Sequence, residues 1–437
     1  MRKYEEVIEY LYAQLPVFMK QGASAYKKDL NRTLELCEAL GNPQDKIKTI
    51  HVGGTNGKGS SSHLIAAVLQ ESGYKVGLYT SPHLVDFTER IRVGGQPVEK
   101  QWVVDFVQAN LALIERVKPS FFELTVAMCL DYFQQKNVDI AVIEVGLGGK
   151  FDSTNIIHPE VSLITNIGMD HSDILGNTLV EIASEKAGII KKDAVVVVSE
   201  KQEEVKQVFI DTAREQGAKL YFGSDFYQAS FKENLREGDP NIYIKSRYER
   251  EKTGNYHFEL LGSYQTRNIP GVLKTLDCLY EKGFNITPQS VKEGLARVSE
   301  ITGLQGRWQK IDDFPQVICD TGHNVDGIKQ IVSQLNKTPY RKLRMVLGMM
   351  GDKDVDAILA LLPPLADYYF CAPDNARAIP AADLQAKAAR LKLRGSWYPT
   401  VVEAIQAARK DSTYSDLVFV GGSNFVVADA LRDYSGQ

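Results

Sequence analysis

A glycine-rich stretch directly after a short β-branched run holds the residues best suited to chemistry. It reads Gly54-Thr55-Asn56-Gly57-Lys58-Gly59-Ser60, and apolar residues at helical spacing follow it. Glycines let backbone N–H groups turn toward an anion, the helix N-terminus adds partial positive charge, and Lys58 adds a full charge. The Ser60 hydroxyl suits a magnesium ion. The stretch therefore predicts a strand–loop–helix phosphate site formed by Gly57, Lys58, Gly59 and Ser60.

The stretch departs from the general P-loop pattern in two places. Val52 stands where that pattern has its first glycine, and Gly59 separates Lys58 from the hydroxyl of Ser60. The alternative is an ordinary glycine-rich turn between a strand and a helix. The phosphate site is favoured, because a lysine and a hydroxyl stand where phosphate binding needs them.

Two further candidates stand at the ends of expected strands. Glu144 ends a largely apolar run, and a carboxylate buried there is costly unless a cation meets it. That cation is either a magnesium ion or a lysine. His171 lies in a polar loop after the next strand, and we expect it to serve the metal, with Asp170 and Asp173 as rival ligands.

Three cationic or polar positions are less specific. The local pattern around Lys186 indicates an ordinary surface lysine on a helix. Asp320, His323 and Asn324 follow a strand, which fits a ligand loop and equally a simple turn in which Asn324 or Asp326 caps the next helix. Arg307, at the presumed boundary between two domains, could reach phosphates that the first domain binds.

Strands that alternate with helices must position these residues. We expect strands near residues 75–80, 138–145, 161–167 and 194–199, and helices at 4–15, 29–40, 101–117 and about 120–136. This alternation predicts a doubly wound, mostly parallel α/β sheet, in which ligands gather at the carboxyl ends of the strands. Residues 221–261 alternate in places and predict antiparallel strands, as an edge extension of the same domain.

A second, smaller α/β unit of the Rossmann-like type is expected at the C-terminal end. Its strands are predicted at residues 316–319, 343–347, 368–371 and 417–420. The stretch 300–307 has two glycines and few apolar residues. We therefore place the domain boundary there, with a P-loop domain over residues 1–300 and the second domain over 301–437.

Composition limits the function classes. A net charge of −4 over 437 residues gives no reason to expect nucleic acid as a partner. The five cysteines are scattered and show no metal-binding spacing, which is typical of a reducing compartment. The N-terminus lacks the apolar core of a signal peptide, and no segment is apolar over the roughly 18 residues of a membrane span. We expect a cytoplasmic monomer without a membrane partner.

Nine short motifs follow one another over nearly the whole chain. They are Gly54-Thr55-Asn56-Gly57-Lys58-Gly59-Ser60, Tyr79-Thr80-Ser81-Pro82-His83-Leu84, Glu89-Arg90-Ile91, Glu144-Val145-Gly146-Leu147-Gly148-Gly149, Asp152-Ser153-Thr154-Asn155, Asp170-His171, Glu185-Lys186-Ala187-Gly188-Ile189-Ile190, Gly306-Arg307, and Asp320 with His323-Asn324. In this order and combination they resemble the folylpolyglutamate synthases and dihydrofolate synthases of the Mur ligase superfamily. One departure is visible: Thr321-Gly322 stands where the commoner family form has Gly-Ala, while the polar residues keep their places.

The resemblance implies an ATP-dependent amide ligase that uses two magnesium ions. It would join L-glutamate to the γ-carboxylate of a folate, or to dihydropteroate in members that also act as dihydrofolate synthases. ATP would phosphorylate the acceptor carboxylate, and the glutamate amine would attack the acyl phosphate.

The resemblance also assigns roles by position. Gly57, Lys58, Gly59, Ser60, Asn268, Arg307 and Asp320 would bind ATP, with His323 near its phosphates. Ser60, Ser81, Glu144, His171 and Lys186 would serve the metal ions, Lys186 after carbamylation into an anionic ligand. The catalytic group would comprise Lys58, Glu144, His171, Lys186 and His323. The pterin substrate would contact residues 26–29, then Phe121, Phe122 and Glu123, and then Asp152, Ser153, Thr154 and Asn155.

Two other functions remain open at this point. A Mur-type ligase acting on a cell-wall precursor is disfavoured by the Gly-Lys-Gly-Ser form of the loop, in place of Gly-Lys-Thr-Thr. A nucleotide-binding regulator without ligase activity is disfavoured because Glu144, His171 and Lys186 are all present.

Overall fold

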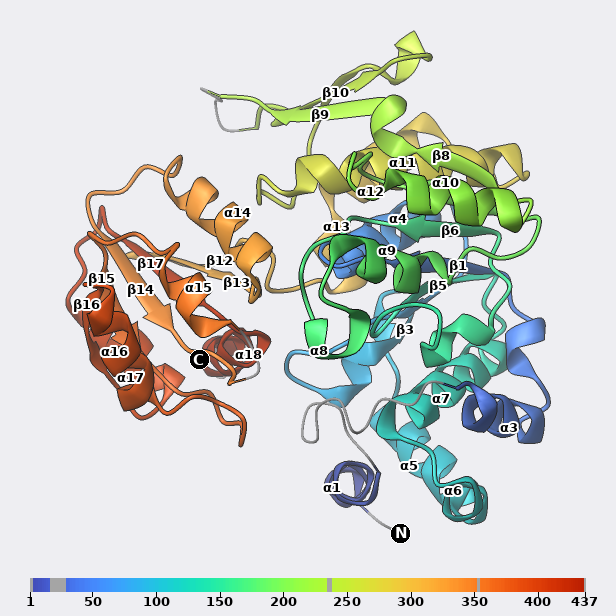
Figure 1. The fold of residues 1–437 in the computed structure, drawn as a ribbon, viewed down its shortest axis with the longest axis horizontal. Helices are drawn as coiled ribbons and strands as arrows, with labels where there is room; N and C mark the ends of the chain where they lie inside the picture. The colour runs from blue at the N-terminus through green and yellow to red at the C-terminus, as the bar shows by residue number, and fades with distance from the viewer. Residues whose placement is uncertain (1–2, 16–28, 234–237, 352–353, 436–437) are drawn as a thin grey trace. The chain divides into compact units, whose positions relative to one another are not determined.

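A computed structural model describes residues 3–15, 29–233, 238–351 and 354–435 of the chain. The chain divides into two compact units. One comprises Met1–Glu259 with Gln265–Leu304, and the other comprises Leu260–Tyr264 with Gln305–Gln437. Each unit is built around its own large sheet with helices packed against it (Figure 1).

The first unit contains an eight-stranded sheet in the order β4-β3-β2-β5-β1-β6-β7-β8. The strands from β2 to β8 in this order run parallel, whereas β3 and β4 pair antiparallel at one edge. Strands covered on both faces need nearly continuous apolar runs, as in β5 and β7. The expected doubly wound, mostly parallel sheet is confirmed. Its strands are β1 (Thr49–Gly53), β2 (Val76–Tyr79), β3 (Ile91–Val93), β4 (Gln96–Pro97), β5 (Ile140–Glu144), β6 (Val161–Ile164), β7 (Val195–Val198) and β8 (Lys219–Phe222).

Helix α4 (Lys58–Glu71) packs against this sheet and against three other helices, and all its residues from 60 to 69 are buried. The helix expected over residues 101–117 is two helices, broken at Asn110. The Asn110 side chain donates to the Phe106 carbonyl at 2.9 Å, a local bond that competes with the regular helix. The other helices are α1 (Tyr4–Gln14), α3 (Asn31–Ala39), α5 (Lys100–Ala109), α6 (Leu111–Val117), α7 (Phe121–Gln135), α8 (Ser172–Leu175), α9 (Leu179–Ala187), α10 (Lys206–Glu215), α11 (Gln265–Glu281), α12 (Pro288–Ala296) and α13 (Val298–Thr302).

Residues 227–256 carry the expected antiparallel strands, but not as an extension of the large sheet. They form a separate three-stranded sheet of β9 (Tyr227–Phe231), β10 (Ile242–Ser246) and β11 (Gly254–Tyr256). Helix α11 packs against β9. The segment belongs to the first unit, as expected, but it does not extend the edge of the large sheet, because β8 already forms that edge and the chain then turns away.

The second unit contains a six-stranded sheet in the order β12-β13-β17-β14-β15-β16, parallel except for β12. Its two edge strands, β12 and β16, were not predicted. An edge strand need not be apolar on both faces, and the sequences of these two are polar, so neither shows the apolar run by which the other strands were predicted. The strands are β12 (Gln309–Asp313), β13 (Gln316–Asp320), β14 (Leu343–Leu347), β15 (Asp367–Phe370), β16 (Arg394–Trp397) and β17 (Leu417–Gly421). The helices are α14 (Val325–Leu335), α15 (Val355–Leu359), α16 (Ala381–Arg390), α17 (Val401–Lys410) and α18 (Asn424–Ser435).

The carboxyl ends of four strands meet at one edge of the first unit's sheet. In β1, Val52 lies beside Glu144 of β5, and Gly53 lies beside Ile164 of β6. In β2, Tyr79 lies beside Ile143 of β5. The loops that follow these strands are therefore neighbours. Among the described residues, no helix is both long and apolar enough to cross a membrane.

Candidate active site

The glycine-rich loop links β1 to α4 and requires glycine at two positions. Gly54 has φ +131° and Gly57 has φ +87°, a region that side chains other than hydrogen disfavour. A Cβ atom on Gly54 would lie 1.9 Å from Thr165 Oγ1, and one on Gly57 would lie 2.2 Å from Asn268 Oδ1. The loop is thus packed tightly between the β6 loop and the first turn of α11.

Replacing Gly57 with alanine should weaken ADP binding about tenfold or more, because the left-handed backbone alone costs about 1–2 kcal/mol and the clash with Asn268 adds to it. Calorimetric titration with ADP measures this. Gly73→Ala is the matched control: Gly73 has nearly the same φ, +88°, and a Cβ there meets nothing within 4 Å. Equal ADP affinity in the Gly57→Ala variant and wild type would contradict the prediction.

Backbone and side-chain bonds tie the loop to the segment after β6. The Thr55 N–H donates to the Asn166 carbonyl at 2.8 Å, and the Asn56 N–H donates to Asn166 Oδ1 at 2.9 Å. The Gly168 N–H donates to Thr55 Oγ1 at 3.0 Å. These bonds fix the loop before any ligand binds, which lowers the cost of ordering it.

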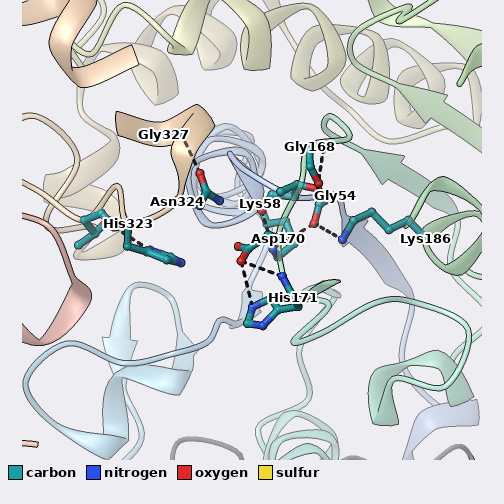
Figure 2. Close-up of polar contacts among 11 residues, drawn as sticks. Gly54, Lys58, Gly168, Asp170, His171, Lys186, His323, Asn324 and Gly327 are labelled. Carbon is teal, nitrogen blue, oxygen red and sulfur yellow. Dashed lines mark hydrogen bonds and ion pairs between the residues drawn. The ribbon is translucent and has the colours of Figure 1, made fainter. Parts of the chain in front are cut away.

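Lys58 lies over this loop. Its ammonium group donates to the Gly54 carbonyl at 3.1 Å and to the Thr55 carbonyl at 3.0 Å (Figure 2). Its charge therefore stays beside the backbone of the glycine-rich turn. Ser60, two residues on, is buried, and its Oγ accepts from Gln265 Nε2 at 3.0 Å. Asn268, one turn further along α11, donates to Gln265 Oε1 at 2.8 Å.

Lys186 comes to the same carbonyl from the opposite side. Its Nζ donates to the Gly54 oxygen at 2.8 Å (Figure 2). The side chain belongs to α9 and is only 4% exposed, so the surface position that its local sequence indicated was wrong. Burial, with the charge of Lys58 adding to it, lowers the pKa of Lys186 to about 7. A sizeable neutral fraction makes this amine a nucleophile at neutral pH.

Glu144 ends β5 at the same edge of the sheet and is 4% exposed. Its Oε2 accepts from the backbone N–H of Ser81, in the loop after β2, at 3.1 Å. A buried carboxylate held by a backbone donor is oriented, and its charge favours a cation beside it.

His171 follows β6 and begins α8 in the left-handed conformation, at φ +51°. Its ring Nε2 lies 3.9 Å from Asp170 Oδ1, and its backbone N–H donates to the same oxygen at 3.0 Å (Figure 2). Asp170, one of the rival ligands, thus sits directly against the histidine. The side chain of His171 remains 27% exposed, enough to reach a ligand.

This set of donors fits a magnesium ion. Among the described residues, no three His, Cys, Asp or Glu side chains form a cluster that could hold a metal by themselves. Magnesium is usually bound through one or two carboxylates, with water and phosphate oxygens completing the shell. Glu144 supplies a buried carboxylate at the edge that carries the glycine-rich loop, so the residues present fit a metal bound together with phosphates.

The first predicted substrate segment begins α7. Phe121 stacks on Tyr12, with ring centroids 4.8 Å apart, and the Arg90 guanidinium lies 5.2 Å from the Phe121 centroid. Phe122 lies over Gly146, where a Cβ atom would be 2.3 Å from its ring. Glu123 is buried and caps its own helix by accepting from the Ser120 N–H. Residues 26–28, predicted for the same substrate, lie outside the described residues.

The second predicted substrate segment uses most of its side chains internally. Asp152 Oδ1 accepts from the Thr154 N–H at 2.9 Å, and Oδ2 accepts from the Leu147 N–H at 2.8 Å. Burial raises the pKa of Asp152. Asn155 donates to the carbonyls of Lys150 and Gly188, at 3.1 and 3.0 Å. Residues 152–155 are thus a rigid segment, and all four are buried.

Sequence reasoning missed His51, which lies within β1 and bonds to Thr154. The signal was available: a polar side chain inside a buried apolar run, the same signal that singled out Glu144.

In the second unit, the loop after β13 gathers the predicted polar residues. Asp320 Oδ2 accepts from the Trp308 N–H at 2.8 Å and from the Tyr264 hydroxyl at 2.6 Å, and burial raises its pKa. Arg307 Nη1 donates to Thr321 Oγ1, and His323 Nδ1 lies 2.9 Å from the Thr321 carbonyl. The capping role of Asn324 is confirmed, since its Oδ1 accepts from the Gly327 N–H at 2.8 Å (Figure 2).

Two protein-family models match successive stretches of the chain. The Mur ligase middle domain matches residues 52–275, and the glutamate ligase domain of Mur ligases matches residues 306–424. The folylpolyglutamate synthase of Lacticaseibacillus casei is 34% identical, over 98% of each chain. The dihydrofolate synthase/folylpolyglutamate synthase of Bacillus subtilis is 30% identical, also over 98% of each chain.

Solved structures agree with these relatives. E. coli FolC in complex with DHPP and ADP has a TM-score of 0.85 at 28% identity and covers 100% of this chain and 98% of its own. A bifunctional folylpolyglutamate synthase/dihydrofolate synthase with Mn, AMPPNP and L-glutamate bound has a TM-score of 0.83 at 28% identity, over 100% of this chain and 98% of its own.

Proposed function

The chain belongs to the folylpolyglutamate synthase/dihydrofolate synthase family of Mur ligases, and we propose that it joins L-glutamate to the γ-carboxylate of a folate or to dihydropteroate. It is an ATP-dependent enzyme that uses a divalent metal ion. The observation that carries the substrate-level proposal is the convergence of Lys58 and Lys186 on the Gly54 carbonyl, at the sheet edge that also carries Glu144. The Lys58 ammonium, the amine of Lys186 and a buried carboxylate there suit a metal–nucleotide complex.

The reaction proceeds in two steps, phosphoryl transfer and amide formation. The acceptor carboxylate attacks the γ-phosphorus of ATP, which forms an acyl phosphate and releases ADP. The amine of L-glutamate then attacks the acyl carbon; the amide bond forms, phosphate leaves, and the amine loses a proton. Because an acyl phosphate is quickly lost to water, the residues around it must exclude solvent.

The first unit supplies the groups that face the phosphates in this proposal. The backbone of Gly57 and Gly59 and the Ser60 hydroxyl hold the phosphate oxygens, and Lys58 stabilises the charge that develops on the transferred group. Ser60, Ser81, Glu144, His171 and carbamylated Lys186 would hold two magnesium ions. When bound, these ions neutralise phosphate charge.

Other residues bind the remaining parts of the substrates. We assign Asn268, Arg307 and Asp320 to the nucleotide and place His323 near its phosphates. We assign residues 121–123 and 152–155 to the pterin substrate. The first domain, residues 1–300, would thus bind ATP and pterin, and the second, 301–437, would be the ligase domain. A cytoplasmic location is proposed, consistent with five buried free thiols; the monomeric state stays a prediction.

The deciding assay measures ADP release from ATP in the presence of L-glutamate. We expect release with tetrahydrofolate, and a second run with dihydropteroate shows whether dihydrofolate synthase activity is present as well. Omission of L-glutamate is the control and should abolish sustained release, because the acyl phosphate then has no amine to accept it. Turnover with a UDP-linked muropeptide and none with either pterin would contradict the proposal.

A further inference from the structure

His51 lies in the middle of β1, three residues before the glycine-rich loop begins at Gly54. Its side chain is fully buried, and its Nε2 lies 2.8 Å from Thr154 Oγ1. Thr154 belongs to the segment 152–155, about a hundred residues further along the chain. One strand thus leads into the phosphate loop and also contacts the substrate segment.

The hydrogen bonds around Thr154 run in one direction. The Thr154 hydroxyl donates its single proton to Asp152 Oδ1, so its oxygen is left to accept from His51 Nε2–H. His51 Nδ1 then carries a lone pair, and it has no hydrogen-bond partner among the described residues. In the opposite direction, the proton would sit on His51 Nδ1, which would bury an N–H donor without an acceptor. A buried donor without a partner is rarer in proteins than a buried acceptor without one.

The proton arrangement does not change near neutral pH. Burial, helped by the charge of Lys191, lowers the pKa of His51 to about 3. The ring is therefore neutral during catalysis, and it takes no part as an acid or base.

The segment is held from its other end as well. The Lys191 ammonium donates to the Asn155 carbonyl at 2.6 Å, and Asn155 Nδ2 reaches the Gly188 carbonyl at 3.0 Å. These bonds come from the chain that follows α9. The bond from His51 connects the segment 152–155 to β1, the strand that leads into the phosphate loop.

We propose that His51 is a positioning residue for the pterin substrate: through Thr154 and Asp152 it sets the segment 152–155 relative to the phosphate loop. This rests on the proposed function, in which that segment contacts the pterin. A rigid strand then fixes how far the acceptor carboxylate lies from the γ-phosphate of ATP. Correct alignment of the two reacting groups raises the reaction rate and the affinity for the substrate. His51 would have this effect without touching either substrate.

Steady-state kinetics of the full chain test this. His51→Leu should raise the KM for the pterin substrate about five- to tenfold, the loss of one buried hydrogen bond, and Thr154→Val should raise it at least as much, because it also removes the bond to Asp152. Both should change the KM for ATP less than about twofold. The double variant should be no worse than Thr154→Val alone, because that variant already lacks the bond that His51→Leu removes. His51→Gln should recover most of the affinity, since its amide N–H can donate to Thr154 Oγ1.

Thr49→Val is the matched control. Thr49 lies on the same strand and face as His51, is equally buried, and its hydroxyl has no partner among the described residues, so all KM values should stay as in wild type. Additive effects, equal increases in every KM, or a glutamine variant as poor as leucine would overturn the proposal. If His51→Leu fails to fold, Thr154→Val decides, and an unchanged pterin KM there overturns it too. Absence of wild-type turnover would instead refute the proposed function.

Discussion

Replacing Lys58 or Glu144 with alanine is expected to reduce kcat for glutamate ligation on the order of 100-fold or more, as loss of a charge-stabilising group in a preorganised site does. Lys58 is held over the loop by the Gly54 and Thr55 carbonyls, and Glu144 is oriented by the Ser81 N–H. A water molecule that takes the place of either side chain in the alanine variant would not be held in the same position. ADP release with tetrahydrofolate and L-glutamate measures the effect.

Glu144→Gln separates charge from shape, because a glutamine oxygen can still accept from Ser81 while carrying no charge. We expect it to be as inactive as Glu144→Ala and to bind Mn²⁺ with ADP more weakly. Glu160→Gln is the control, a glutamate that precedes β6 at the opposite, amino end of the strands. Near-normal turnover by a folded Glu144→Ala enzyme would refute the metal assignment.

Replacing Lys186 with alanine or arginine is expected to reduce kcat to a similar degree, because we propose that Lys186 acts as a carbamate. The neutral amine attacks CO₂, forms an N–C bond and loses a proton, which leaves an anionic carboxylate on the side chain. Burial lowers the pKa of Lys186 and so favours the neutral amine that attacks CO₂. The carbamate keeps one N–H that can still donate to the Gly54 carbonyl. Arginine keeps the cation but cannot be carbamylated, so it should not restore activity.

Removal of CO₂ from the buffer provides a readout that does not depend on mutation. Activity should fall in CO₂-depleted buffer and return with bicarbonate, and native mass spectrometry should show an adduct of one CO₂ in wild type but not in Lys186→Arg. Lys274→Met is the matched control, since Lys274 is also 4% exposed but packs against the Tyr221 and Phe226 rings. Full activity without CO₂, or an adduct retained in Lys186→Arg, would exclude the carbamate.

Local sequence was enough for the features that depend on neighbouring residues. A glycine-rich turn with lysine and hydroxyl, apolar strand runs and polar residues at their carboxyl ends all have short-range signatures, so the parallel sheet and the loop were predictable. Asn110 and the polar edge strands β12 and β16 were not predicted, because a single side-chain bond or an edge position outweighs the pattern. The order of the nine motifs added the family, which no single motif determines.

Tertiary structure alone decided the environment of each side chain. The local sequence around Lys186 predicts a surface lysine, yet packing against the glycine-rich loop buries the side chain and lowers its pKa to about 7. Asp152 and Thr154 are predicted substrate contacts, and the structure shows that they bond to each other and that Thr154 bonds to His51, a residue about a hundred positions away. Burial and hydrogen-bond partners depend on which distant segments pack together, and that packing, not residue type, sets the charge and the direction of each group.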